Sequence, residues 1–285
     1  MGRGRFDTMK GSLTEAEHGL EDTYWWFVGR RTIIDGILSR FASRKRVAVD
    51  VGCGTGRNMA ILALYADCVA GLDRSLTALS IAASRGLAVG CVDGHFLPLA
   101  DGSVDLLTAF DVLEHLDDDV RALEEFNRVL RPGGLLLLTV PAYRFLWSEH
   151  DEALMHRRRY VASELHMKLN RTGYDVAFRS YAVFFVFFPI LLYRLFRGLF
   201  PRDAMSPKAS HVMLPPLLNS LFTWMLRTEA FLMKFVRLPW GTSIVMLSGK
   251  QPVAGHGPSV CGPDAVQSLE SRPAEVSWPG DRRHS

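Results

Sequence analysis

A glycine-rich turn directly after a short apolar run constrains the fold more than any other feature. Residues 47–51 read Val-Ala-Val-Asp-Val, and Gly52, Gly54 and Gly56 follow at alternate positions. A β-branched, nearly continuous apolar run is typical of a buried parallel strand, and glycine lets a turn approach a ligand because it has no Cβ. Residues 57–66 are strong helix formers, so they predict a helix. The glycines therefore lie at a strand-to-helix turn, where doubly wound sheets bind nucleotides.

The spacing of the glycines narrows the choice of ligand. A dinucleotide fold would show Gly-x-Gly-x-x-Gly, and a phosphate-binding P-loop would need Gly-Lys-Ser/Thr. Here the pattern is Asp-x-Gly-x-Gly-x-Gly, with Asp50 before the first glycine. A carboxylate at that place would repel a pyrophosphate and attract a ligand that carries an ammonium group.

Further segments in the first half of the chain also carry motifs typical of a nucleotide-binding sheet. Residues 69–73 form a second strand that ends in Asp73, and a carboxylate there can accept hydrogen bonds from both ribose hydroxyls. The other segments are 90–99, 97–115 and 129–140. Together with the glycine turn, they resemble the class I S-adenosylmethionine (SAM)-dependent methyltransferases. The similarity is greatest to the small-molecule branch typified by ubiquinone-biosynthesis enzymes.

This resemblance implies a fold, a cofactor and a reaction. The fold would be α/β, a Rossmann-like seven-stranded sheet with helices on both faces and its last strand antiparallel. The cofactor would be SAM, and the reaction a direct in-line transfer of a methyl group from the sulfonium to an acceptor. The cofactor-binding residues that it implies are Asp50, Gly52, Gly54, Gly56, Asp73, Asp93, Gly94 and Asp111. Among these, the glycines would contact the methionine portion, Asp73 the ribose, Asp93 the adenine, and Asp50 the ammonium group.

His115 is the nearest candidate for a general base, because the family's fourth-strand loop faces the methyl group. A helix-capping or packing role for Glu114-His115 is the alternative. The segment after the fifth strand supplies candidate substrate contacts at His150, His156, Arg158 and Tyr160. Its basic residues could hold an anionic group such as a phosphate or carboxylate, or form a solvated turn. His150, Asp151 and His156 have no second cluster to complete a metal site, so none is expected.

Residues 1–43 precede this core and include an aromatic run with Tyr24, Trp25 and Trp26. One interpretation is a helix that packs its rings on the sheet. The other is a lid that covers the cofactor or substrate and excludes water, with these three rings contacting the substrate.

The second half of the chain is basic and strongly apolar. Residues 151–250 contain 14 Lys and Arg against 6 Asp and Glu, whereas residues 1–150 contain 16 against 20. Residues 180–193 carry no charge but are too short to span a bilayer, which takes about 20 residues. Residues 217–236 form a second apolar stretch with basic residues between the rings. Such segments are typical of helices that lie in a membrane surface, although a closed pocket for an apolar substrate is the alternative.

We expect the chain to be divided into residues 1–43 as an N-terminal helical lid, 44–180 as the SAM-binding core, 181–240 as an apolar and basic helical insertion, 241–250 as a late core strand, and 251–285 as a disordered tail. The absence of a signal peptide at the N-terminus and of any Cys-x-x-Cys pair favours the cytoplasm, with peripheral contact on the inner face of the membrane through residues 180–236. Arginines interleaved with Leu and Phe argue against nucleic acid.

The expected function is methyl transfer to a small or lipid-linked acceptor. Two alternatives remain at this stage. One is a non-catalytic SAM-fold membrane accessory protein, and the other is a soluble methyltransferase that acts on a diffusible metabolite.

Overall fold

The computed structural model describes residues 19–196 and 214–252. The expected tail at 251–285 lies almost wholly outside the described residues, as do the first part of the expected lid and the middle of the expected insertion.

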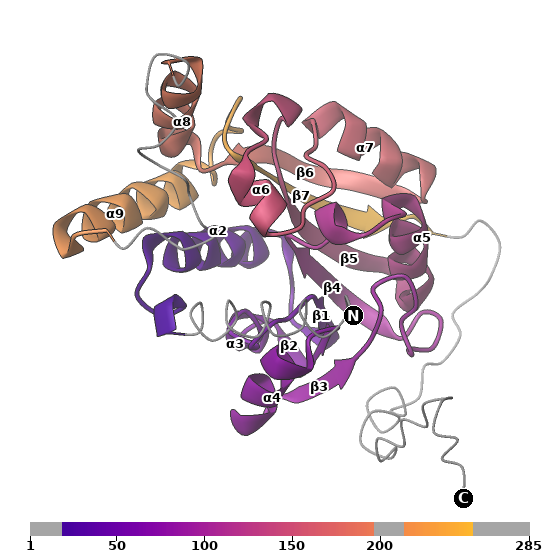
Figure 1. The fold of residues 1–285 in the computed structure, drawn as a ribbon. Helices are drawn as coiled ribbons and strands as arrows, with labels where there is room; N and C mark the ends of the chain where they lie inside the picture. Colours follow the sequence, from indigo (N-terminus) through magenta and orange to yellow (C-terminus); the bar gives the residue numbers. More distant parts are fainter. Residues whose placement is uncertain (1–18, 197–213, 253–285) are drawn as a thin grey trace, which may run out of the picture.

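The centre of the molecule is a seven-stranded sheet in the order β3-β2-β1-β4-β5-β7-β6 (Figure 1). Its strands are β1 (Lys45–Val51), β2 (Ala66–Asp73), β3 (Ala88–Cys91), β4 (Val104–Phe110), β5 (Leu130–Pro141), β6 (Tyr174–Ala182) and β7 (Ser243–Lys250). Strands β1 to β5 pair in parallel, and β7 is antiparallel to both of its neighbours. The order reverses between β1 and β4, which is the point where open α/β sheets bind ligands. The predicted fold class is thus confirmed.

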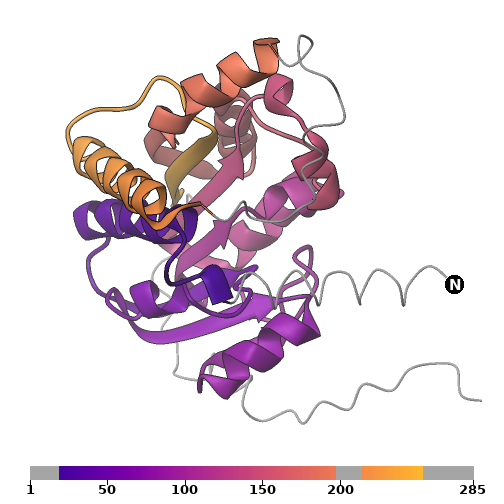
Figure 2. The ribbon, with the colours of Figure 1, turned by 60° about the vertical axis from the view of Figure 1, so that its left-hand side comes forward.

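Helices cover both faces of the sheet (Figures 1 and 2). On one face lie α2 (Trp25–Phe41), α3 (Met59–Leu62), α4 (Leu76–Ser84) and α9 (Pro216–Leu232), and on the other lie α5 (Asp119–Val129) and α7 (Ala162–Arg171). Successive strand residues alternate between the two cores: Ala48 and Leu106 pack toward α2, whereas Val49 and Leu107 pack toward α5. Alternation of this kind follows from the two-residue period of a strand.

Two long helices that are far apart in sequence pack together. α2 buries Ile33, Ile34, Ile37 and Leu38 in the core, and α9 lies directly beside it (Figure 2). The close approach depends on Gly29, because a Cβ at that position would lie 2.1 Å from Cδ1 of Leu226. Leu226 is only 1% exposed. α9 is therefore part of the folded body and not an appendage.

The segment between β6 and β7 begins and ends at neighbouring positions of the sheet. Ala182 at the end of β6 pairs with Ser243 at the start of β7, and a Cβ on Gly241 would lie 2.1 Å from the carbonyl oxygen of Ala182. β6 continues past the expected core boundary at residue 180 and ends at Ala182. α8 (Phe184–Phe196) follows it, with Pro189 inside the helix.

A buried carboxyl group joins the two helices of this segment. Glu229 of α9 is 0% exposed. Its carboxylate accepts hydrogen bonds from the backbone N–H groups of Val183, at 2.5 Å, and Phe184, at 2.9 Å. It thereby satisfies donors at the start of α8, which would otherwise lack partners.

One predicted helix is much shorter than expected. Residues 57–66 were expected to be helical, but α3 ends at Leu62 and β2 already begins at Ala66. Sheet pairing explains the difference, because Ala66 pairs with Lys45 of β1 and the N–H of Lys45 donates to the Tyr65 carbonyl at 2.8 Å. Tertiary pairing overrides the local helix propensity here.

The apolar second half forms the helices α8 and α9 and the end of β6. Within residues 19–196 and 214–252, no helix has both the length and the apolar character that crossing a bilayer requires.

Candidate functional site

The glycine turn and the acid of β2 meet at the carboxyl edge of the sheet. Gly52, Gly54 and Gly56 have φ values of 73°, 55° and 82°, in the left-handed region that favours glycine. The N–H of Gly52 donates to the Leu72 carbonyl at 2.7 Å, and the N–H of Gly54 donates to Oδ2 of Asp73 at 2.9 Å. The turn after β1 is therefore fixed to the end of β2.

The three glycines have different surroundings. A Cβ on Gly52 would lie 2.4 Å from Val112, and one on Gly56 would lie 2.2 Å from Leu87. A Cβ on Gly54 would meet no atom within 4 Å. Gly52 and Gly56 are thus required by packing, whereas Gly54 borders the open space that a ligand would fill.

Asp50, near the end of β1, is a buried carboxyl group with one oxygen that lacks a partner among the described residues. It is 0% exposed, and its Oδ1 accepts a hydrogen bond from the Thr108 hydroxyl at 2.6 Å. Its Oδ2 has no hydrogen-bond partner among the described residues. Burial raises the pKa of Asp50 to about 7. Because an uncompensated buried carboxylate is costly, a cationic ligand in the adjoining space would stabilise it. The residues present therefore fit SAM, which carries an ammonium and a sulfonium group.

Asp111 connects the end of β4 to α2. Its backbone is in the left-handed region, with a φ of 56°, and its N–H donates to the Thr139 carbonyl at 3.0 Å. Its Oδ1 accepts from the Thr139 hydroxyl at 3.0 Å, and its Oδ2 pairs with Arg30 of α2 at 2.5 Å. Sequence reasoning missed Arg30, although an arginine that closes the aromatic run was the available signal. α2 is thus tied to the carboxyl edge by an ion pair.

Asp93 and Gly94 follow the edge strand β3. The N–H of Val92 donates to the Asp73 carbonyl at 2.9 Å, which keeps this loop beside the glycine turn. Asp93 accepts hydrogen bonds from the backbone N–H of His95 at 2.9 Å and from its ring at 2.7 Å. The backbone bond from His95 is the main cause of a lowered pKa for Asp93. Gly94 faces Leu116, 3.3 Å from where its Cβ would be.

Two loops meet beside Asp111. One contains Glu114 and His115 at a short 3-10 turn, Leu113–His115, and the other contains His156, after α6 (Glu149–Ala153). The rings of His115 and His156 are 4.8 Å apart between centroids, edge to face. The structure therefore brings together one expected catalytic residue and one expected substrate residue.

The structure corrects the expectation for Tyr160. This side chain is 0% exposed, and its hydroxyl donates to Asp119 at 2.8 Å, so Tyr160 packs in the core and does not line a substrate space. The guanidinium of Arg158 donates to the carbonyls of Leu116 and Asp117, at 3.0 and 2.7 Å. Arg158 thus has a role in holding the two loops together. His150 lies on α6, and its expected substrate contact stays a prediction.

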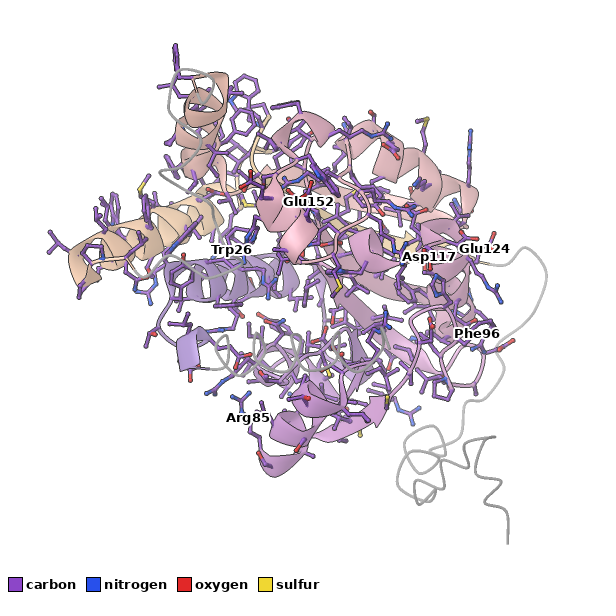
Figure 3. All side chains as sticks on the ribbon, viewed as in Figure 1. Trp26, Arg85, Phe96, Asp117, Glu124 and Glu152 are labelled. Atoms are coloured by element: carbon purple, nitrogen blue, oxygen red, sulfur yellow. The ribbon has the colours of Figure 1, made fainter. Side chains whose placement is uncertain are left out.

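The aromatic residues at the start of α2 face α9. Trp25 packs against Phe222, with ring centroids 5.3 Å apart, and its backbone N–H donates to Oδ1 of Asn219 at 2.9 Å. Trp26 lies on the same helix (Figure 3) and packs against the core beneath α2 and α9. The ring of Tyr24 lies 5.8 Å from that of Trp25 between centroids and is tilted by 51° from it. These contacts agree with the packing interpretation, and the lid stays a prediction.

The strand order of the sheet and the glycine turn after β1 are those of an α/β domain that binds a nucleoside-containing ligand. Residues 49–138 match the family described as methyltransferase domain. A probable S-adenosylmethionine-dependent methyltransferase from Mycolicibacterium smegmatis is 33% identical over 162 residues, which cover 55% of this chain and 62% of that protein. The chain thus spans less than two thirds of the length of this relative. With the sheet order, these matches show that the region around residues 49–138 is similar to SAM-dependent methyltransferase domains.

Solved structures show the same fold. A chain from the Haloferax volcanii complex of the Trm112 methyltransferase activator with a candidate methyltransferase superposes with a TM-score of 0.56 at 22% identity, covering 87% of this chain and 98% of that one. The [4+2]-cyclase SpnF superposes with a TM-score of 0.51 at 21% identity, covering 79% and 81%. Since a cyclase shares the fold, the fold alone does not determine the reaction. The reaction has to be inferred from the residues of the site.

Proposed function

We propose that the protein is an enzyme that transfers the methyl group of SAM to a small or lipid-linked acceptor. The observations that carry the proposal are the open space at Gly54, whose N–H donates to the Asp73 carboxylate, and the buried Oδ2 of Asp50, which has no hydrogen-bond partner among the described residues. In this proposal the glycine turn contacts the methionine portion, Asp50 balances the ammonium group directly or through water, and Asp73 accepts from the ribose hydroxyls. Asp93 is the residue that contacts the adenine.

The donor is intrinsically reactive, so the protein mainly has to align it with the acceptor. Orientation of this kind contributes on the order of 7–11 kcal/mol to lowering a barrier. A general base is needed only where the attacking atom carries a proton, and His115 is the residue proposed for that role.

Calorimetric titration with SAM tests the cofactor. Gly54→Ala fills the open space, and Gly86→Ala is the matched control, because Gly86 also has a positive φ, 74°, and no atom within 4 Å of its Cβ position. Both substitutions introduce the same backbone strain, about 1–2 kcal/mol. We expect the wild type to bind SAM, Gly54→Ala to bind at least roughly tenfold more weakly, a loss of about 1.4 kcal/mol, and Gly86→Ala to bind normally. If the wild-type protein is folded but does not bind SAM, the proposal that it is a methyltransferase is refuted. The alternative of a non-catalytic SAM-fold membrane accessory protein is then supported.

We further propose that the acceptor is lipid-linked and reached by peripheral contact with a membrane. α8, α9 and the loop after α9 expose large apolar side chains, namely Phe188, Leu192, Phe196, Leu217, Leu218, Leu221, Trp224, Phe231, Leu232, Phe235, Val236 and Trp240. Figure 3 shows side chains of both helices pointing away from the body of the molecule. Arg227, Lys234 and Arg237 lie among them. Apolar and basic side chains together favour an anionic lipid surface.

Sedimentation with vesicles that contain anionic lipids tests this contact. We expect the wild type to pellet with the vesicles and Trp224→Ser to pellet less. Phe96→Ser is the control, since Phe96 is similarly exposed, 61% against 63%, but follows β3 on another part of the surface (Figure 3). Wild-type protein that binds SAM yet stays in the supernatant would favour the diffusible-metabolite alternative.

A further inference from the structure

We propose that Glu114, His115 and His156 form a binding site for a divalent metal ion, next to the space where the methyl donor binds. The inference deepens the proposed function and rests on it for the role of the ion, although not for its binding. The sequence predicted no metal site from His150, Asp151 and His156. The structure instead combines His156 with Glu114 and His115, two residues from a distant part of the chain.

The three side chains are close enough to share one ion. Each offers one ligand atom, and these atoms all lie within 4.8 Å of one another. Protein ligands lie about 2.0–2.2 Å from zinc, so they are up to roughly 4 Å apart across the ion. Small rotations of the side chains would therefore bring the three atoms into coordination.

Glu114 provides independent evidence that something is bound here. Its side chain is 0% exposed, and neither carboxylate oxygen has a hydrogen-bond partner among the described residues. Buried charges in proteins are paired or coordinate metals. Arg30 and Arg159 are the positive charges that act on Glu114. They already form ion pairs with Asp111 and Asp151, respectively. A cation between Glu114 and the two imidazoles would satisfy this carboxylate.

The orientation of His156 is also that of a metal ligand. Its Nδ1 is 2.9 Å from Oδ1 of Asp151, a carboxylate that is itself 0% exposed. Asp151 is held in turn by Arg159, through Nε at 2.7 Å and Nη2 at 3.0 Å. A histidine that binds a metal commonly donates its other ring N–H to a carboxylate, which fixes the ring and leaves the second nitrogen for the ion. With Nδ1–H donating to Asp151, the free lone pair is on Nε2.

The two loops are joined so that the cluster keeps its shape. The N–H of Arg157 donates to the Glu114 carbonyl at 2.8 Å, and Nε of Arg157 donates to the His115 carbonyl at 3.0 Å. In Figure 3, Asp117 and Glu152 mark the two segments that supply the ligands, after β4 and at α6. The site is thus assembled by backbone contacts and not only by the ligands themselves.

The ligand set indicates the type of ion. Two imidazoles and one carboxylate suit zinc and neighbouring transition metals, whereas magnesium and calcium prefer oxygen ligands. Three protein ligands leave coordination positions open. Val112 is two residues before Glu114 in the chain and lies next to Gly52 in space, where a Cβ on Gly52 would be 2.4 Å from it. An acceptor bound to the ion would therefore lie beside the glycine turn.

This position favours an acceptor that reacts through oxygen. A hydroxyl group coordinated to a divalent ion loses its proton to solvent more readily. An oxygen lone pair would then attack the methyl carbon of SAM. The O–C bond forms as the C–S bond breaks, and the bonding pair stays on sulfur, giving the methyl ether and neutral S-adenosylhomocysteine.

Direct measurement of bound metal tests the site. Untagged wild-type protein is stripped with a chelator, dialysed against Zn²⁺, Mn²⁺ or Mg²⁺ alone, and analysed by elemental mass spectrometry, with Co²⁺ absorption as a second readout. We expect about one transition-metal ion per chain, and an affinity at least roughly tenfold lower for Glu114→Gln and for His156→Asn. His166→Asn is the matched control, because His166 lies on α7 and contacts Asn170.

Two outcomes would overturn the proposal. One is folded wild-type protein without stoichiometric metal, in which case a proton neutralises Glu114. The other is Glu114→Gln protein that binds metal as tightly as the wild type. SAM titration of the same metal-free sample separates this failure from a failure of the proposed function, since cofactor binding does not require the ion.

Discussion

Glu229→Gln tests whether the buried carboxyl group on α9 makes the stability of the protein depend on pH. Glu229 accepts backbone hydrogen bonds at the start of α8, and glutamine has the same shape without a titratable proton. Burial is the main influence on Glu229 and raises its pKa to about 7, although N–H groups of residues 183–185 act in the opposite direction. The substitution therefore removes one proton-binding equilibrium. It also places an amide NH2 against one of the two backbone N–H groups, which is a cost that does not vary with pH.

The size and sign of the effect follow from the two pKa values. The ordinary value is 4.5 and the folded value about 7, and at 1.36 kcal/mol per pKa unit the difference corresponds to about 3 kcal/mol. A raised pKa means that the folded state holds the proton more tightly than the unfolded state. The contribution to stability is thus fully present below pH 4.5, and it is lost as the pH rises through about 7.

Urea denaturation of both proteins at a series of pH values measures this difference. Between pH 4.5 and 8 the wild type should lose about 3 kcal/mol more unfolding free energy than the variant. Asp50 and other carboxyl groups titrate in both proteins, so the comparison isolates Glu229. Parallel pH profiles for the two proteins would show that the folded state does not perturb this carboxyl group, and the reasoning from burial would fail.

Two further substitutions test the cofactor site and the helix pair. Asp73→Asn should weaken SAM binding by roughly 10–100-fold in calorimetry, since a hydrogen bond to a charged group contributes about 1.5–3 kcal/mol; Asp67→Asn, at the exposed start of the same strand, should bind normally, and equal effects would contradict the assignment. Gly29→Ala should lower the unfolding free energy in urea, because overpacking against Leu226 costs about 1–3 kcal/mol and exceeds the gain in helix propensity of about 0.8–1.0 kcal/mol. A more stable Gly29→Ala protein would show that α9 can move away at little cost.

The parts of the site that the sequence predicted are those with short-range signals. Gly54 and Asp73 each follow a recognisable strand, and the parallel sheet brings the ends of neighbouring strands together without further information. The late core strand at 241–250, which the structure shows as β7, was predicted for the same reason, because its pattern is local. The Rossmann-like sheet followed from these strands together with the family resemblance.

What the sequence could not predict depends on contacts between distant segments. Tyr160 looked like part of a basic, solvent-facing loop, but Asp119 draws its hydroxyl into the core. The helix after the glycine turn was overestimated, because its last residues pair with β1. Glu114 was noted only as part of a helix start. Its burial and its closeness to His156 arise from the loop after α6, which no local pattern reveals.

The pairing of Ala182 with Ser243 has a consequence for how proteins of this architecture diversify. Everything from residue 183 to residue 242 is, topologically, the loop of a β-hairpin, with its entrance and exit in adjacent positions. The length and sequence of this segment can change without altering the register of any strand, provided that α9 keeps its contacts with α2. The donor half of the sheet, at Gly54 and Asp73, lies across the molecule from this hairpin. Under the proposed function, changes in this segment would alter the methyl acceptor and leave the binding of the methyl donor unchanged.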